Sequence, residues 1–130
     1  MVERIAFKGM TAEQVATMPM EKFMKLIGTR ERRWVLRNSL QYKKIMEKIA
    51  ARGKSGSQKA IRTHTRETVI FPSFIGMSFE IYDGKAYQPI NITAGMVGHR
   101  LGEFAYTTKR VQHSNPGIRA TRGSKFLAVK

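Results

Sequence analysis

The last part of the chain contains no acidic side chain. From Phe104 to Lys130 the sequence has six Lys and Arg residues but neither Asp nor Glu, and Gly, Pro and Asn lie among them. Such a segment has too few apolar side chains to form a core, and its like charges repel one another. The folded core must therefore come from the preceding residues, and the segment itself needs a polyanion to lie against.

The remaining charge is also distributed unevenly. The chain has 130 residues and a formal net charge of +15. Residues 30–66 contain twelve basic and two acidic residues, whereas residues 67–103 contain two basic and four acidic residues. This length fits one modest core. We therefore expect a helical N-terminal extension with a basic linker loop over residues 1–59, an α+β core over residues 60–104 and a basic C-terminal tail over residues 105–130.

The composition excludes several classes of function. The chain has no Cys, so it has no disulfide, thiolate zinc site or thiol nucleophile. It has no apolar run of membrane-spanning length and no signal-peptide pattern at its start, so we expect a soluble intracellular protein. Binding to an anionic membrane surface would require an apolar helix face left free for lipid, whereas the aromatic residues mostly fall where a core needs them.

The first part of the sequence has helical periodicity. Thr11 and Gln14 form a possible capping box for a short helix that ends near Met18. Pro19 suits the first turn of a second helix, which ends at Gly28. Both helices read as a small apolar cap on the core.

A third, longer helix is predicted over residues 30–52, with Thr29 as its cap. Its apolar residues fall within a third of the helix circumference: Trp34, Val35, Tyr42, Ile45, Met46 and Ile49. A basic row lies on a different face: Arg33, Arg37, Lys44 and Lys48. Because this helix has too few acids to compensate the row, we expect the row to contact phosphate. Residues 53–59 predict a flexible loop by their composition.

Alternation of period two then predicts strands. The first strand places three side chains on one face as a cationic ladder: Arg62, His64 and Arg66. Residues 68–76 form an apolar connection, and residues 77–82 form a second strand. Asp83-Gly84 is a type I′ turn signal, and the returning strand over residues 86–92 contains Pro89, which favours a sheet edge or a bulge.

The last predicted element is a short helix, capped by Thr93 and closed by Gly102. The order of elements predicts an α+β fold with N-terminal helices and a small, largely antiparallel three-stranded sheet, followed by a short helix and an extended basic tail.

Enzymatic chemistry has little support in the sequence. His99 and Glu103 are one helical turn apart, which suits a metal pair or a base with its orienting carboxylate. Two ligands do not make a metal site, and no third acid or His lies nearby in sequence. We therefore expect no enzyme, no metal and no cofactor, and we keep a hydrolase centred on this pair only as a distant alternative.

Nucleic acid is the partner that the basic segments favour. A DNA reader usually offers a helix-turn-helix or a zinc finger, and the helices here form no convincing example. A basic, Gly-containing tail without acids suits an RNA whose folded surface shapes it on binding. The residues thus predict an RNA-binding protein. The alternative is a free nucleic-acid chaperone or nucleoid-type DNA-binding protein.

Three stretches of the sequence resemble the small-subunit ribosomal protein nineteen family. The first is Asp83-Gly84-Lys85 followed, after six residues, by residues 92–104 (ITAGMVGHRLGEF). The second is the apolar connection over residues 68–76 (TVIFPSFIG). The third is residues 116–121 (PGIRAT), which resemble the tail of the archaeal and eukaryotic branch, as does the helical N-terminal extension.

The resemblance implies a non-enzymatic component of the small ribosomal subunit, bound to the ribosomal RNA of the head domain. It implies small-subunit ribosomal protein thirteen as a neighbour and a tail that reaches toward the tRNA-binding region. Besides Arg62 and Arg66, the RNA-facing positions that it implies are Lys85, His99, Arg100, Lys109, Arg110, His113, Arg119, Arg122 and Lys125.

Overall fold

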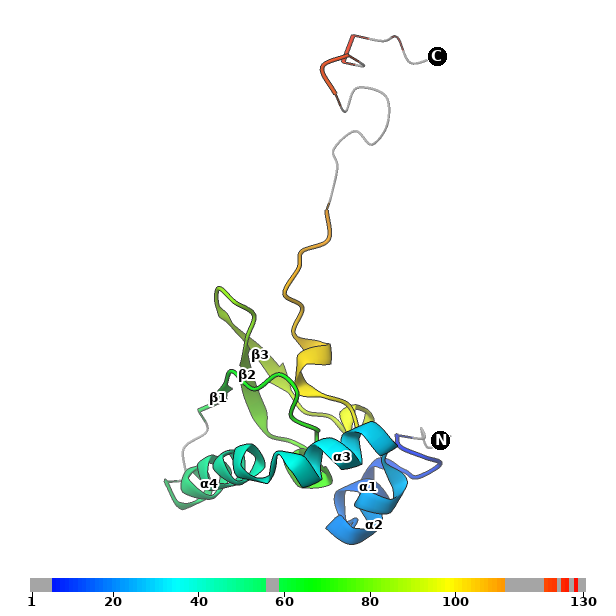
Figure 1. The fold of residues 1–130 in the computed structure, drawn as a ribbon, viewed down its shortest axis with the longest axis vertical. Coiled ribbons are helices and arrows are strands. Elements are labelled where there is room, and N and C mark those ends of the chain that lie inside the picture. The colour runs from blue at the N-terminus through cyan, green and yellow to red at the C-terminus, as the bar shows by residue number, and fades with distance from the viewer. Residues whose placement is uncertain (1–5, 56–58, 112–120, 124, 127, 129–130) are drawn as a thin grey trace.

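The computed structural model describes residues 6–55, 59–111, 121–123, 125, 126 and 128 (Figure 1). Helices come first, and a small sheet with short 3₁₀ helices follows, which confirms the predicted order. The helices are α1 (Ala12–Ala16), α2 (Met20–Leu26), α3 (Thr29–Arg37) and α4 (Ser39–Ser55). The strands are β1 (Ile61–Thr63), β2 (Ser78–Tyr82) and β3 (Tyr87–Asn91). The 3₁₀ helices are η1 (Pro72–Phe74), η2 (Ala94–Met96) and η3 (Leu101–Phe104).

The two short N-terminal helices follow their sequence signals. The Thr11 backbone N–H donates to Gln14 Oε1 at 3.2 Å, which confirms this half of the capping box. Pro19 is the N-cap residue of α2. The side chain of Arg32 then donates to the carbonyl oxygens of Met24, Lys25 and Ile27 at 2.8–3.3 Å. Because these carbonyls end α2, the guanidinium satisfies its C-terminus and fixes the start of α3 against it.

The predicted long helix over residues 30–52 is in fact two helices, α3 and α4, which break at Asn38 (Figure 1). Asn38 has φ −107° and ψ 37°, and both its backbone N–H and its side-chain Nδ2 donate to the Trp34 carbonyl. An Asn side chain competes in this way with the helical hydrogen bonds, so the helix ends and a new one begins at Ser39. Helix α4 then extends to Ser55, farther than the loop predicted from residue 53 allowed.

The apolar stripe of these two helices is confirmed as core. Trp34, Val35 and Ile45 are buried. Three further stripe residues are partly buried against the same cluster: Tyr42, Met46 and Ile49. The break at Asn38 thus changes the direction of the chain without taking the apolar side chains away from the core.

The sheet is mixed, with strand order β1-β2-β3. Strands β2 and β3 pair antiparallel as predicted, but β1 pairs parallel to β2, with Ile61 opposite Phe79 and Thr63 opposite Ile81. The expectation of a largely antiparallel sheet is therefore wrong for β1. A parallel pair needs a long connection between its strands. The apolar residues between β1 and β2 form this connection, and four of them are buried in the core: Val69, Ile70, Phe71 and Phe74.

The β2–β3 turn differs by one residue from the prediction. The Asp83 N–H donates to the Ala86 carbonyl at 3.0 Å, so Gly84 and Lys85 occupy the two central positions. Gly84 has φ +103°, but Lys85 is not among the residues with positive φ, so the turn lacks the two positive φ values that a type I′ turn requires. Pro89 lies in β3, an edge strand, as predicted.

The predicted last helix is also wrong as a single element. Two 3₁₀ helices, η2 and η3, replace it, and Gly98 between them has φ +85°. The backbone here pairs with the connection instead of with itself. The N–H groups of Gly98, Leu101 and Gly102 donate to the carbonyls of Ile70, Thr68 and Arg66 at 2.7–3.0 Å. These groups would be needed for a continuous α-helix, so the pairing with the connection prevents one.

Candidate nucleic-acid interface

Four arginine side chains line one concave site between α3 and the segment that follows η2. They are Arg30, Arg33, Arg37 and Arg100, which we call the arginine site. Three of them are spaced along α3, and Arg100 comes from the N-cap position of η3. The structure thus joins two predicted residues of the basic row, Arg33 and Arg37, with Arg100, which only the family resemblance had implied.

Charge in the arginine site is weakly compensated. Within the described part of the chain, no ion pair involves Arg30, Arg33 or Arg37, and Arg100 Nε lies 3.9 Å from Glu31 Oε1. The Arg100 backbone N–H also donates to Glu103 Oε1 at 3.2 Å, which fixes the residue at the start of η3. Guanidinium groups suit phosphate because their planar donors match its oxygens. Four of them around one concavity can therefore hold a phosphate-rich strand.

Sequence analysis missed Arg30, although a signal for it was present. Arg30, Arg33 and Arg37 have spacings of three and four residues, so they lie on one side of a helix. Trp34 lies on the same helix and is buried, and its Nε1 donates to Glu67 Oε2 at 3.3 Å. This bond ties α3 to the connection that leads to β2, which holds the arginines of α3 close to Arg100.

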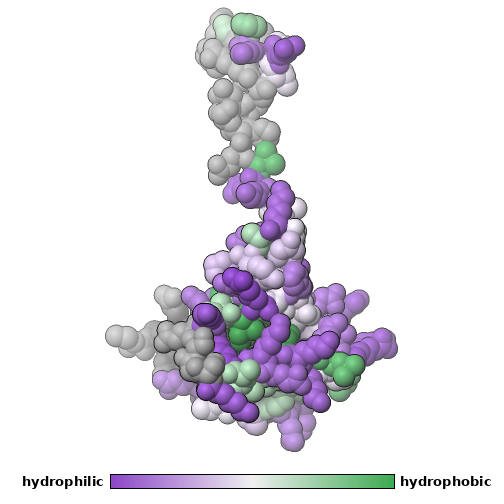
Figure 2. All heavy atoms as spheres, turned by 90° about the vertical axis from the view of Figure 1, so that its left-hand side faces the viewer, coloured by the Kyte–Doolittle hydropathy of each residue, from purple (hydrophilic) through white to green (hydrophobic). Residues whose placement is uncertain are grey.

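The lysines of the basic row lie elsewhere. Lys44 is exposed on α4, beyond the break at Asn38. Lys48 donates from Nζ to the Arg62 carbonyl at 3.1 Å and lines a groove between α4 and β1. Figure 2 shows a hydrophobic floor with hydrophilic side chains around it on the side of the molecule that carries α4 and β1. The row predicted on one helix is therefore divided between two surfaces.

The cationic ladder of β1 is divided as well. Arg62 is exposed, and its Nε lies 2.6 Å from Glu80 Oε2 on the neighbouring strand. The Glu80 carboxylate raises the pKa of Arg62, first through this hydrogen bond and then through its charge. Arg62 thus has its own counter-ion within the sheet, unlike the arginines of α3.

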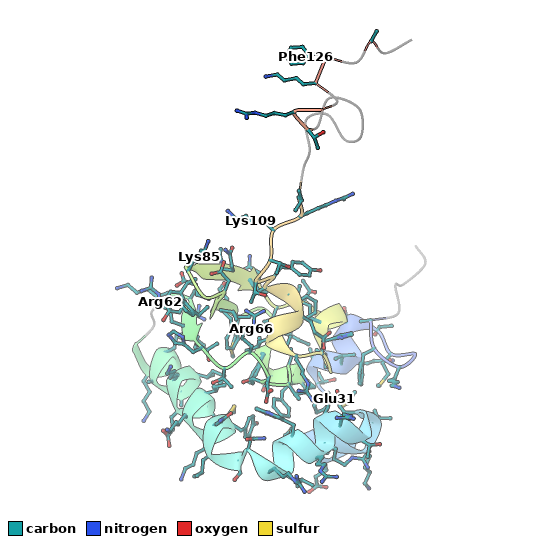
Figure 3. All side chains as sticks on the ribbon, turned by 45° about the horizontal axis from the view of Figure 1, so that its top comes forward. Glu31, Arg62, Arg66, Lys85, Lys109 and Phe126 are labelled. Carbon is teal, nitrogen blue, oxygen red and sulfur yellow. The ribbon has the colours of Figure 1, made fainter. Side chains whose placement is uncertain are left out.

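Arg66 is half-buried and serves as an internal clamp. Its Nη1 donates to the Tyr82 carbonyl at 2.9 Å, and its Nη2 donates to the carbonyls of Gly102 and Ala105. The guanidinium therefore ties the end of β2 to η3 and to the residue where the C-terminal segment begins (Figure 3). Gly102 approaches closely enough that a Cβ there would lie 3.0 Å from the Arg66 Cβ and carbonyl oxygen.

The two residues weighed for catalysis form an exposed pair. His99 Nδ1 lies 2.7 Å from Glu103 Oε2, and the two side chains keep about half of their surface exposed. Among the described residues, no group of three or more potential ligands is placed to hold a metal ion. None of the described helices is long and apolar enough to cross a membrane.

The last group of expected residues surrounds the hairpin and the C-terminal segment. Lys85 and Lys109 line one groove together with Tyr106 and Phe104 (Figure 3). Arg110, Arg122 and Lys125 are exposed. His113 and Arg119 lie outside the described residues. These basic positions, like those on α4 and β1, remain predictions as RNA contacts.

A small α+β domain with converging arginines and basic grooves is typical of an RNA-binding protein. The family Ribosomal protein S19 matches residues 32–113 of the chain. The chain belongs to this family, which confirms the resemblance stated above. It is therefore a small-subunit ribosomal protein that binds ribosomal RNA in the ribosome, where the family has a structural role. The match begins within α3, so it includes every residue of the arginine site except Arg30.

Proposed function

We propose that this chain is a structural constituent of the head of the small subunit, where the arginine site holds the sugar-phosphate backbone of the ribosomal RNA. The observation that carries this proposal is the convergence of Arg30, Arg33 and Arg37 with Arg100 around one concave surface. Phosphate contacts fix the position and orientation of a protein on nucleic acid, and several guanidinium groups in one place give the strongest such contact.

The finer features of this role come from the resemblance. We infer that the chain is of the archaeal or eukaryotic type, that it acts in cytoplasmic ribosomes without enzymatic activity, and that small-subunit ribosomal protein thirteen is its neighbour. We also infer that its three parts, residues 1–59, 60–104 and 105–130, act as a helical extension, a core and a tail.

The tail is inferred to reach toward the tRNA-binding region. Residues 106–111 leave the body of the protein in an extended course (Figure 1), and Tyr106 and Val111 are 79% and 71% exposed. Their exposure leaves their backbone and side chains available to a partner. Arg66 supports this role, because it anchors Ala105, from which the tail departs.

Competition for binding tests the head-domain assignment. A labelled RNA transcript of the small-subunit head domain is bound by the intact protein at moderate salt. It is then displaced by unlabelled head transcript, by a transcript of another small-subunit domain and by duplex DNA. We expect the head transcript to compete at least tenfold better than the other two. Equal competition by duplex DNA would instead identify a general nucleic-acid binder.

Photo-crosslinking tests the partners. A crosslinking side chain in place of Arg122 is introduced into protein that is assembled into small subunits with bound tRNA. We expect crosslinks to tRNA from this position, and crosslinks to small-subunit ribosomal protein thirteen from a second set of surface positions on the core. Crosslinks from Arg122 to ribosomal RNA alone would contradict the proposed reach of the tail.

A further inference from the structure

The outward face of the sheet carries rings as well as charge. In the register of the sheet, Arg62 lies opposite Glu80, and Tyr82 lies opposite Tyr87. Side chains alternate along a strand, so these residues point away from the buried face, which Phe79 forms. His64 continues the alternation of Arg62 just after β1. We call the side chains of His64, Tyr82 and Tyr87 the aromatic face.

The three rings of the aromatic face are held in a fixed arrangement. Ring centroids of His64 and Tyr82 are 4.5 Å apart, those of Tyr82 and Tyr87 are 5.3 Å apart, and those of His64 and Tyr87 are 5.5 Å apart. The Tyr87 hydroxyl and His64 Nε2 share a hydrogen bond of 2.8 Å, and the Tyr82 hydroxyl donates to the Gly84 carbonyl at 3.0 Å. The rings therefore need little ordering when a ligand binds, which favours binding.

Sheet stability alone does not account for this arrangement. A cross-strand aromatic pair such as Tyr82 and Tyr87 does stabilise a hairpin. His64, however, lies beyond the last residue of β1 and is exposed, yet it contacts both tyrosine rings. The guanidinium of Arg62 lies 5.1 Å from the Tyr87 ring centroid and adds a flat, polar surface beside the rings.

The charge of this face makes it unlike the arginine site. Arg62 is paired with Glu80 at 2.6 Å, so the cation and the carboxylate compensate each other. A phosphate placed here would meet Glu80 as well as Arg62. Planar aromatic and guanidinium groups instead offer stacking surfaces for the bases of single-stranded RNA.

Cations at the rim complete the site. Lys85 is exposed in the turn between β2 and β3, and Lys48 lines the groove beside Arg62. Figure 3 shows Arg62 and Lys85 on the same side of the molecule. A strand whose base lies on the rings can thus keep its phosphates near these two lysines.

We propose that the aromatic face binds an unpaired RNA base by stacking, with Arg62 as part of the stacking surface. This inference rests on the proposed function in one respect, namely that the chain binds RNA. It adds a second mode of contact, since the arginine site holds phosphate and the aromatic face holds a base. Of the three ring residues, the sequence placed only His64 in a basic row, and it gave no indication of Tyr82 or Tyr87 as RNA contacts.

The test compares two probes that differ only in their bases. One is a ten-nucleotide single-stranded oligouridylate, and the other is an abasic ribose-phosphate oligomer of the same length. We expect the intact protein to bind the base-bearing probe about 5- to 150-fold more tightly, the range for one stacked base. Binding of both probes is measured as Kd at one fixed salt concentration, because phosphate affinity depends strongly on salt.

Variants assign the base preference to particular rings. H64A and Y87L should remove most of the preference, whereas Y87F, which keeps the ring, should retain it. K85Q should weaken binding of both probes by the same factor, since it removes charge and no ring. Y106A removes an exposed ring outside the aromatic face and should leave the preference unchanged. Thermal unfolding of each variant shows that it is folded; H64A alters an exposed side chain and so decides the matter if Y87L fails to fold.

The outcomes separate this inference from the proposed function. Equal affinity for the two probes, with strong salt dependence, would overturn base stacking and leave phosphate binding intact. A base preference that survives H64A and Y87L but is lost in Y106A would also overturn it. Failure of the intact protein to bind either probe would overturn base stacking, whereas the proposed function fails only if the head transcript does not bind either.

Discussion

The arginine site and the outward face of the sheet both contain arginine, but in opposite electrostatic settings. On α3, Arg30, Arg33 and Arg37 form no ion pair with any described residue. On β1, Arg62 is joined to Glu80 and lies beside the Tyr87 ring. We therefore propose different roles for the same side chain, as a phosphate-binding group on α3 and as part of a stacking surface on β1.

Arg66 extends the comparison to the interior. Only four residues from Arg62 in sequence, it directs its guanidinium to backbone carbonyls of β2, η3 and Ala105. Its charge-assisted bonds join three separate backbone segments of the fold. The position of an arginine relative to strand ends and acids decides its role, and basic composition by itself does not.

The largest expected effect comes from replacing Arg66, and it is on the stability of the folded protein. In R66A, the carbonyls of Tyr82, Gly102 and Ala105 lose a charged donor, and Ala105 is buried. We expect the free energy of unfolding to fall by about 2–4 kcal/mol, as measured by chemical denaturation. R66K, which keeps the charge but not the fork of donors, should recover only part of the loss. R33A, at an exposed site, should change stability by less than about 0.5 kcal/mol. Equal effects of R66A and R33A would contradict the role of Arg66 as a clamp.

The next effect is on the salt dependence of RNA binding. Replacing Arg33 and Arg37 by Gln removes two guanidinium groups of the arginine site. We expect the slope of log affinity against log salt to become shallower by up to about 1.4–1.8, at roughly 0.7–0.9 for each lost phosphate contact. The matched control replaces Lys22 and Lys25, two exposed lysines of α2, by Gln and removes the same charge. A control that flattens the slope as much would show that net charge, rather than the arginine site, governs binding.

Local patterns in the sequence predicted the features that depend on neighbours along the chain. The capping box at Thr11, the apolar stripe of α3 and α4, and the antiparallel pairing of β2 with β3 all follow from periodicity and turn chemistry. The parallel pairing of β1 and the two 3₁₀ helices were not predicted. Both depend on the connection over residues 68–76, whose backbone pairs with residues far away in sequence. Periodicity carries no information on such partners.

The candidate site divides in the same way. Arg33 and Arg37 share a helix face, and this part was visible in the sequence. Arg100 joins them only because Gly98 and the bonds of η3 turn it toward α3. Arg62 and Arg66 looked equivalent on an alternating strand, but β1 ends at Thr63, so Arg66 does not continue its face. The counter-ion of Arg62 is likewise a cross-strand partner, which alternation in one strand cannot reveal.

Removing that counter-ion should make Arg62 resemble the arginines of α3. In E80Q, Arg62 loses the carboxylate that compensates it, so it becomes available to phosphate. We expect the salt slope of RNA binding to steepen by up to about 0.7–0.9, the value of one phosphate contact. E13Q changes the net charge equally at an exposed position in α1 and serves as the control. If both variants steepen the slope alike, the effect comes from total charge and Arg62 is not a distinct group.

The smallest effect concerns Asp83, the other acid of the β2–β3 hairpin. Whereas Glu80 compensates an arginine, the Asp83 carboxylate accepts hydrogen bonds from the backbone N–H groups of Ala86 and Lys85 and from the side chain of Gln88. These bonds, that of Ala86 first, lower the pKa of Asp83 from 3.8 to about 2. Because the pKa is lower in the folded state, the ionised carboxylate stabilises the hairpin above about pH 4, and this stabilisation is lost as the pH falls through about 2.

Two variants test whether Asp83 acts in the turn, unlike Glu80, which pairs with an arginine. The Tm difference between the intact protein and D83A should be constant above pH 5 and should shrink as the pH falls toward 2. In Q88A, which removes one donor to the carboxylate, an NMR titration should show the pKa of Asp83 moving back toward its ordinary value. RNA affinity should not change in Q88A, because the bonds of Asp83 serve the turn and not the ligand. A Tm difference that is independent of pH would mean that the charge of Asp83 contributes nothing, and that its side chain shapes the turn in either protonation state.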